Sequence, residues 1–167
     1  MTNRKNLILL RHAKSSWKRS ELDDRDRPLN GRGRRAASAM GRLMEDQELV
    51  PDHVLCSTAQ RTRETAALFF ADWSDPPPIV FRDELYHASP VQIESILNSV
   101  DDSIEDLMII GHNPGLEEFL NQHSGNAIHL PTAALAHLDF ELDSWSHFKD
   151  VTPGTLFRFV RPGDICF

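Results

Sequence analysis

Four side chains in this sequence have the chemistry of a phosphate-binding site, namely Arg11, His12, Arg61 and His112. The planar guanidinium of arginine holds a phosphate through two parallel hydrogen bonds. Histidine offers a ring nitrogen that is neutral or charged near pH 7. Taken singly, each of these is an ordinary polar residue at the end of a strand or the start of a helix. Two arginines and two histidines around one point, however, would form a pocket for a tetrahedral dianion.

These side chains follow the ends of predicted strands. The continuous apolar run at 7–10 is followed by Arg11 and His12, and the run at 107–110 is followed by Gly111 and His112. A short strand at 53–57 precedes a helix whose first turn holds Arg61. Such apolar runs are typical of strands buried on both faces of a parallel sheet. The carboxyl ends of parallel strands meet at one edge of the sheet, where ligands bind. We therefore expect the four side chains to come together.

The whole pattern predicts four strands that alternate with helices, followed by a final strand pair. We expect strands at 7–10, 53–57, 79–81, 107–110, 138–142 and 155–161. We expect helices at 31–47 (capped by Asn30), 59–71 and 90–97, and one that starts with Asn113 as cap and Pro114 in its first turn. This order predicts an α/β fold, a three-layer α/β/α sandwich with a mostly parallel central sheet and a C-terminal antiparallel strand pair. No linker or internal repeat interrupts it, so we expect a single domain over 1–167.

Charge and composition limit the possible partners. Residues 1–35 hold 11 of the 18 Lys and Arg but only 4 of the 25 Asp and Glu, a local charge of +7 in a chain of net charge −7. An acidic body repels nucleic acid, while a local basic cluster attracts a smaller anion. The sequence has no long apolar run and no signal-peptide layout, and Cys56 and Cys166 lie too far apart to suggest a disulfide framework. We expect a cytoplasmic protein with no nucleic-acid or membrane partner.

Three motifs surround the four side chains: Leu-Leu-Arg11-His12-Ala13, Cys-Ser57-Thr-Ala59-Gln-Arg61-Thr-Arg-Glu-Thr65-Ala66 and Ile-Gly-His112-Asn-Pro. They resemble the motifs of the histidine phosphatase superfamily, also called the phosphoglycerate mutase-like fold, and they occur in the family's order. Three further segments are similar to the SixA-type phosphohistidine phosphatases: Arg11-His12-Ala13-Lys14-Ser15-Ser16-Trp17, Arg27-Pro28-Leu29 and Asp83-Glu84-Leu85-Tyr86. Ala13 stands where many superfamily members have glycine, a departure that SixA-type sequences share.

The resemblance implies a role for each of the four side chains. His12 matches the nucleophile that takes the phosphoryl group, Arg11 and Arg61 match the phosphate clamps, and His112 matches the histidine that binds phosphate and stabilises the transition state. Elementary electrostatics agrees, because an imidazole attacks phosphorus only when neutral, and nearby cations disfavour its protonation. Phosphoryl transfer itself depends mainly on positioning and charge neutralisation.

Other residues complete the predicted site. We add Lys14 and Ser15, which follow the nucleophile, to the phosphate-binding residues. In the larger superfamily a carboxylate after the third strand protonates the leaving group, and Glu84, with Asp83 beside it, lies in about that place. In SixA-like members this acid is poorly defined or absent. Two interpretations of Glu84 therefore stay open: it donates the proton, or it only structures the loop.

The predicted function is hydrolysis of phosphohistidine on a protein through a phosphorylated His12, with no cofactor and no metal. The partner would be a phosphohistidine-bearing protein, such as a phosphotransfer domain or a phosphotransferase-system protein, and phosphate would be the product. No long insertion is left over to form a lid, and a labile P–N bond tolerates a weak or missing acid. The alternatives are a phosphomonoesterase acting on a small phosphorylated metabolite and a non-catalytic phosphate-binding module.

Two other enzyme classes fit the sequence less well. A cysteine phosphatase needs five residues between its cysteine and arginine, whereas Cys56 and Arg61 are separated by four, without the glycines of such a loop. A metal-dependent hydrolase needs compact ligand spacing, and the eight histidines include no His-Glu-x-x-His motif.

Overall fold

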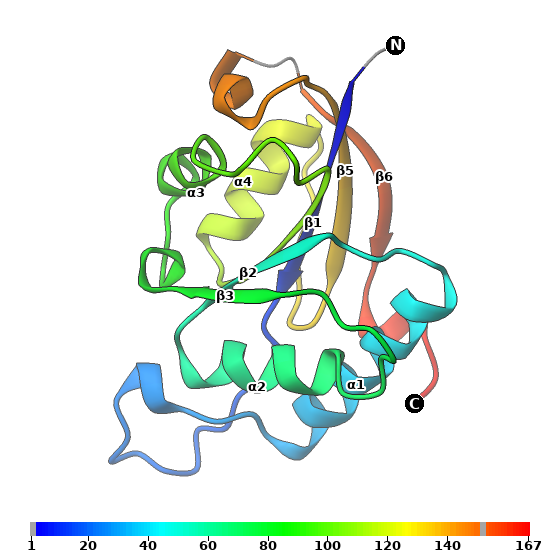
Figure 1. Ribbon diagram of the computed structural model, residues 1–167. Helices are drawn as coiled ribbons and strands as arrows, with labels where there is room; N and C mark the ends of the chain where they lie inside the picture. Colours follow the sequence, from blue (N-terminus) through cyan, green and yellow to red (C-terminus); the bar gives the residue numbers. More distant parts are fainter. Residues whose placement is uncertain (1–2, 151–152) are drawn as a thin grey trace.

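The computed structural model describes residues 3–150 and 153–167. Its six strands form one sheet in the order β3-β2-β4-β1-β5-β6 (Figure 1). The strands are β1 (Arg4–Arg11), β2 (His53–Ser57), β3 (Ile79–Arg82), β4 (Asp106–Gly111), β5 (Leu135–Glu141) and β6 (Thr155–Val160). The helices are α1 (Gly31–Asp46), α2 (Gln60–Phe69), α3 (Pro90–Leu97) and α4 (Gly115–Ser124), and the short 3-10 turns are η1 (Asp24–Asp26), η2 (Asp83–Leu85), η3 (Trp145–Asp150) and η4 (Pro162–Asp164).

The sheet is mostly parallel. Strands β3, β2, β4 and β1 run in the same direction, β5 runs antiparallel to β1, and β6 runs antiparallel to β5. The predicted α/β fold with a C-terminal antiparallel pair is confirmed. In the register of β1 with β4, Arg11 lies opposite Gly111. The carboxyl ends of β1, β2 and β4 are therefore neighbours at one edge of the sheet.

Side chains of β1 alternate between two apolar cores. Leu7 and Leu9 pack in the core shared with α3 and α4, whereas Ile8 and Leu10 pack in the core shared with α1 and α2. All four are 0% exposed, so the central strand is buried on both faces, as the apolar run predicts. Figure 1 shows the two helix pairs on opposite faces of the sheet.

Helix α1 contains glycines because it packs unusually close to its neighbours. The predicted N-cap is confirmed, since Asn30 Oδ1 accepts from the Gly33 N–H at 2.8 Å. A Cβ added at Gly33 would lie 2.1 Å from the Lys14 carbonyl oxygen, and one at Gly41 would lie 1.8 Å from the carbonyl oxygen of Phe69. The glycines thus let α1 approach both α2 and the loop that follows β1.

Two predicted helix boundaries are wrong. The helix expected over 59–71 ends at Phe69. Helix α4 begins at Gly115 with Pro114 as its N-cap residue, and the expected cap Asn113 instead donates its Nδ2–H to the Leu130 carbonyl at 2.8 Å. Asn113 thereby ties the end of β4 to the segment before β5. Within the described residues, no helix combines the length and the apolar character needed to cross a membrane.

Candidate active site

The ends of β1 and β4 bring two histidines together. The His12 backbone N–H donates to the Gly111 carbonyl at 3.1 Å, which joins the two strand ends. The imidazole rings of His12 and His112 lie 5.2 Å apart between centroids. Arg61 enters from the first turn of α2, directly after β2, and is 2% exposed. Arg11 completes the set as the last residue of β1.

A backbone hydrogen bond determines which nitrogen of His12 is free. His12 Nδ1 lies 2.7 Å from the Ala13 carbonyl oxygen, which can only accept. Nδ1 therefore carries the hydrogen and donates it, and Nε2 of the neutral ring keeps the lone pair. Ala13 is itself held in place, because its N–H donates to Thr65 Oγ1 at 2.9 Å. The arrangement presents Nε2 as a nucleophile from a fixed ring.

The surroundings of His12 keep it neutral. Burial is the largest cause and lowers its pKa to about 3, against the hydrogen bond to Ala13, which acts in the opposite direction. The positive charges of Arg61, Arg11 and Arg27 lower this pKa further. At neutral pH the ring is therefore unprotonated and available for attack on phosphorus.

His112 is also neutral and buried. Burial, His12 and Arg61, in that order, lower its pKa to about 2. Its Nε2 lies 2.8 Å from Ser57 Oγ, and that oxygen already accepts the Ala59 N–H at 3.3 Å. A serine hydroxyl donates one hydrogen and can accept two, so the Ser57 hydroxyl can donate to Nε2. In this arrangement Nδ1 of His112 carries the ring hydrogen and can donate to an anion.

Three buried nitrogens of this cluster have no hydrogen-bond partner among the described residues. They are Nε of Arg11, Nε of Arg61 and Nδ1 of His112. Buried polar groups are nearly always paired in folded proteins, because an unpaired one costs about 1–3 kcal/mol. All three belong to the side chains that the sequence assigns to phosphate binding. These N–H groups are free to donate hydrogen bonds to a bound oxyanion.

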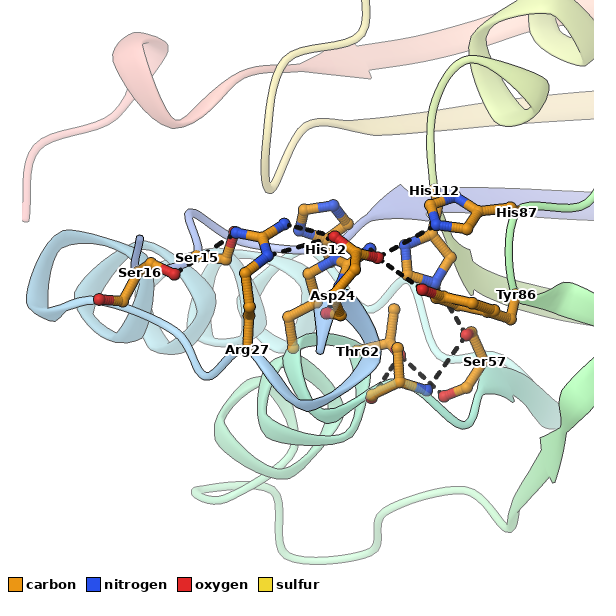
Figure 2. Close-up of polar contacts among 12 residues, drawn as sticks. His12, Ser15, Ser16, Asp24, Arg27, Ser57, Thr62, Tyr86, His87 and His112 are labelled. Carbon is orange, nitrogen blue, oxygen red and sulfur yellow. Dashed lines mark hydrogen bonds and ion pairs between the residues drawn. The ribbon is translucent and has the colours of Figure 1, made fainter. Parts of the chain in front are cut away.

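Asp24 of η1 lies at the centre of the cluster (Figure 2). Arg61 donates Nη2–H to its Oδ2 at 3.0 Å and Nη1–H to its backbone carbonyl at 2.7 Å. The same Oδ2 accepts the Tyr86 hydroxyl at 2.5 Å and faces His87 Nε2 at 3.1 Å. Burial raises the pKa of Asp24, but the bonds from Tyr86, Arg61 and His87 outweigh it and hold the pKa well below its usual range. The carboxylate therefore stays ionised.

Arg27 joins η1 to the loop after β1. It is 7% exposed and donates to Asp24 Oδ1 through Nε at 3.2 Å and Nη2 at 3.1 Å. Its Nη1–H donates to Ser15 Oγ at 2.7 Å, and its guanidinium stacks on Trp17 at 3.5 Å from the ring centroid. Ser15, predicted to bind phosphate, thus contacts Arg27, and its hydroxyl acts here as part of the loop's framework.

The structure places the other predicted site residues outside the cluster. The Lys14 side chain is exposed and lines a separate cleft of about 510 Å³ with Arg32 and Arg161. Glu84 is exposed, pairs with Arg82 Nε at 3.3 Å, and has a pKa lowered by its own backbone N–H and by Arg82. Asp83 accepts from Thr58 Oγ1 at 2.6 Å and from Arg25. No contact in the described residues joins Glu84 or Asp83 to either site histidine.

Cys56 lies beside the site but is chemically inert in this position. It is 0% exposed, and its Sγ donates to the Ser57 and Thr62 carbonyls. Burial raises the pKa of the thiol to about 12. A thiol with this pKa is not a nucleophile at neutral pH. Among the described residues, no three or more His, Cys, Asp or Glu side chains form a group that could hold a metal ion.

The sequence does not predict that four further residues lie in the cluster, namely Asp24, Arg27, Tyr86 and His87. The alternating charges of 23–27 indicate an ordered loop, which η1 confirms, but not that this loop lies over the end of β1. Tyr86 and His87 directly follow the carboxylates chosen as acid candidates. Arg27 and Tyr86 stand in segments that are similar to SixA-type sequences, and that similarity is the signal for them. For His87 the signal is its position next to Tyr86.

Comparison with known proteins identifies the family of this chain. Residues 7–97 match the model of the histidine phosphatase superfamily (branch 1). The chain is 33% identical over 156 residues to an uncharacterized protein of Mycobacterium tuberculosis, covering 87% of this chain and 93% of that one. It is 33% identical over 148 residues to an uncharacterized chloroplastic protein of Arabidopsis thaliana, covering 83% of this chain and 68% of that one.

Solved structures agree with this assignment. A candidate phosphohistidine phosphatase SixA of Agrobacterium tumefaciens has a TM-score of 0.81 and 30% identity over 95% of this chain and 98% of that chain. A candidate SixA of Nakamurella multipartitia has a TM-score of 0.82 and 26% identity over 95% and 96% of the two chains. A protein histidine phosphatase SixA complexed with tungstate shares the fold at a TM-score of 0.80 and 16% identity, over 95% and 98% of the chains.

Proposed function

The chain belongs to the histidine phosphatase superfamily, and on that premise we propose that it hydrolyses phosphohistidine on a protein through a phosphorylated His12. The observation that carries the proposal is the hydrogen bond from His12 Nδ1 to the Ala13 carbonyl at 2.7 Å. It leaves Nε2 as the attacking nitrogen, in a cluster whose buried arginine and histidine donors lack partners among the described residues. The superfamily assignment itself implies a phosphatase; the phosphohistidine substrate and independence from metal ions are our proposals.

In the first step His12 Nε2 attacks phosphorus. The Nε2–P bond forms, the P–N bond of the substrate breaks, and its electron pair goes to the leaving imidazole nitrogen, which takes up a proton. Arg11, Arg61 and His112 donate to the phosphoryl oxygens and stabilise the charge that spreads over them in the transition state. The low pKa of His12 keeps its lone pair available at neutral pH.

In the second step water attacks the phosphorylated His12. The new O–P bond forms as the Nε2–P bond breaks, inorganic phosphate leaves, and the electron pair returns to Nε2. The Ala13 carbonyl holds the ring in the same tautomer throughout, so the next cycle begins without rotation of the imidazole. The protein residues supply all the charge stabilisation in this scheme.

A phosphohistidine on a protein fits the surroundings better than a small ester. The connection from β3 to α3, residues 83–89, is short, whereas the longer connection from β1 to α1, residues 12–30, folds over the end of β1 and carries Asp24 and Arg27. His87, at the edge of the cluster, is half exposed, so a side chain presented from a protein surface can approach from that side. Two of the similar solved structures are named as phosphohistidine phosphatases and one as a protein histidine phosphatase, which supports the same substrate class. The cytoplasm remains our predicted location.

Rapid-quench labelling tests this proposal. A chelator-treated protein mixed with a phosphohistidine protein carrying labelled phosphate should show transient label on His12 that is labile in acid and stable in base. His12→Ala should lose both label and turnover. The kcat/KM for phosphohistidine should exceed that for sugar phosphates and phosphoglycerates. Label on Cys56 or a serine would contradict the mechanism, and a sugar phosphate preferred by about 100-fold would contradict the substrate class.

A further inference from the structure

The first step of the proposed reaction needs a proton that the central histidines do not carry. The leaving imidazole nitrogen receives an electron pair when the P–N bond breaks, and a proton must reach it. Burial keeps both His12 and His112 neutral, with pKa values lowered to about 3 and about 2. Asp24 stays ionised, and Glu84 points to Arg82. None of these side chains carries an acidic proton at neutral pH, because the remaining N–H of a neutral imidazole is far too weak an acid.

Two further titratable side chains lie beside the histidine pair, Tyr86 and His87. The Tyr86 hydroxyl is engaged with Asp24, and burial and Asp24 raise its pKa, which leaves His87. Its ring centroid lies 5.3 Å from that of His112 and 4.1 Å from that of Tyr86 (Figure 2). Its side chain is 50% exposed, so it lies at the mouth of the cluster between solvent and the buried rings. Histidine is the side chain that ordinarily gains and loses a proton near neutral pH. The other charged groups near it are Asp24 and, across Tyr86, Arg61 and Arg25.

The backbone holds His87 at this position. Its φ is 51°, a left-handed conformation that costs free energy in a non-glycine residue and persists only where the surroundings impose it. The next residue, Ala88, packs directly on the start of α4, because a Cβ at Gly115 would lie 1.7 Å from the Ala88 carbonyl oxygen. Gly115 follows His112 by three residues. The loop that carries His87 is therefore pressed against the segment that carries His112.

Asp24 orients the imidazole of His87. Nε2–H of His87 donates to Asp24 Oδ2 at 3.1 Å, and the Tyr86 hydroxyl donates to the same oxygen at 2.5 Å. Arg27 and Arg61 hold the carboxylate from its other sides. With Nε2–H engaged, Nδ1 is the nitrogen that can exchange a proton with a bound substrate. A histidine whose second nitrogen is fixed by a carboxylate is the usual arrangement of a general acid–base.

We propose that His87, oriented by Asp24, transfers the proton to the leaving group of the substrate. This inference rests on the proposed function and names the acid that protonates the leaving group in its first step. In the first step the Nδ1–H bond of His87 breaks, its hydrogen joins the leaving nitrogen, and the electron pair stays on Nδ1. In the second step Nδ1 takes a proton from the attacking water while the bond from His12 Nε2 to phosphorus breaks. His87 thus ends the cycle as it began.

Leaving-group dependence separates this role from a structural one. We would measure kcat/KM for a series of aryl phosphates, from dinitrophenyl to phenyl phosphate, and for a phosphohistidine peptide. His87→Gln keeps a donor towards Asp24 but has no proton acidic enough to transfer near neutral pH, and His87→Asn better tolerates the left-handed backbone. Both variants should stay within about 3-fold of the parent on dinitrophenyl phosphate. On phenyl phosphate they should lose about 100-fold or more, because that leaving group needs an acid, and on phosphohistidine, whose P–N bond is labile, they should lose less.

A matched control removes an equivalent pair elsewhere. His147 Nδ1 faces Asp143 at 3.2 Å and both side chains are exposed, so His147→Gln should leave the rate on every substrate unchanged. Equal losses on all leaving groups, or none, in the His87 variants would overturn the inference. If the parent protein also places label on His12, only the acid assignment fails. If the parent shows no label on His12, the proposed function fails and this inference fails with it.

Discussion

Arg61 donates two hydrogen bonds to Asp24, one to its carboxylate at 3.0 Å and one to its backbone carbonyl at 2.7 Å. This pair joins the first turn of α2 to η1, which lies in the connection from β1 to α1. The side chain of Arg61 is 3% exposed and that of Asp24 is 41% exposed. The cationic cluster therefore contains one fixed negative charge, which moderates its attraction for anions and determines how the arginines are oriented.

Asp24→Asn should tighten the binding of anions while lowering stability. The amide preserves the shape but removes the negative charge that faces Arg61 and Arg27, so the field at His12 becomes more positive. We expect the inhibition constant of vanadate to fall by about 3- to 10-fold. The free energy of unfolding should fall by about 1 kcal/mol, since Asp24 is partly screened by solvent.

The surface pair of Asp72 with Arg42 provides the control for Asp24. These side chains lie 3.2 Å apart and are both exposed. Asp72→Asn should change neither the vanadate constant nor the stability beyond error. Weaker vanadate inhibition in Asp24→Asn would show that the carboxylate mainly holds Arg61 in place.

Arg61→Lys should lower kcat/KM by about 100-fold, a size typical of losing one oriented transition-state donor. Lysine keeps the charge but not the planar fork, so it cannot bind Asp24 and a phosphoryl oxygen together. Arg63 lies on the same helix, is exposed, and stacks on Phe81 at 4.2 Å. Arg63→Lys should stay within about 3-fold in steady-state assays. Equal effects of the two substitutions would contradict a phosphate-clamp role for Arg61.

The two cysteines should react with alkylating agents very differently. Cys166 is exposed, whereas Cys56 is buried and burial raises its pKa to about 12. Iodoacetamide at pH 8 should therefore modify Cys166 alone in the folded protein, as read by mass spectrometry of peptides. A Cys166→Ser variant should keep its activity after the same treatment. Activity that disappears as Cys56 is modified would revive a thiol mechanism.

Much of the fold can be predicted from the sequence because the central strands are apolar on both sides. Leu7 to Leu10 pack alternately into two cores, so every position must be apolar, and the sequence shows an uninterrupted apolar run. The strand ends of β1, β2 and β4 follow from it, and with them the approach of His12 to His112. A parallel sheet leaves few other places for these side chains.

The rest of the site depends on loop geometry that no periodic pattern encodes. Asp24 lies in the cluster because Arg27 and Arg61 donate hydrogen bonds to its carboxylate and hold it over the end of β1. Glu84 and His87 are three residues apart, yet the turn at η2 directs one to Arg82 and the other to Asp24. Which of them faces the histidines is decided by tertiary packing. The sequence therefore leaves two interpretations of Glu84 open and gives no sign of where the His87 side chain lies.

Acidification should destabilise the folded protein from about pH 6.5 downwards. The pKa values of His12 and His112 are lower in the folded state than the ordinary value of 6.5, so the unfolded chain binds more protons between pH 6.5 and about 3. The free energy of unfolding then rises with pH in this window, by up to about 1.4 kcal/mol per pH unit for each histidine. Urea unfolding at pH 7 and pH 5 measures the difference. His12→Gln should lose less stability than the parent between these values; an equal loss would contradict a buried neutral His12.

Gly33→Ala should be destabilising although alanine is the better helix former. Within a helix, alanine ordinarily stabilises by up to about 1 kcal/mol relative to glycine. At Gly33 the new Cβ would lie 2.1 Å from the Lys14 carbonyl oxygen and 2.8 Å from its nitrogen, so helix α1 or the loop after His12 must move. Steric overpacking of this kind costs about 1–3 kcal/mol.

The same displacement should also slow catalysis, because Lys14 stands two residues after His12. Its carbonyl also accepts the Asn30 N–H at 2.9 Å, so the loop and the cap of α1 move as one unit. We expect kcat on an activated phosphate ester to fall by about 10-fold or more, along with a lower unfolding temperature. Gly163→Ala is the matched control, since a Cβ there meets nothing within 4 Å and should alter neither quantity. Gly33→Ala with unchanged kcat and higher stability would show that the contact between α1 and the loop does not position His12.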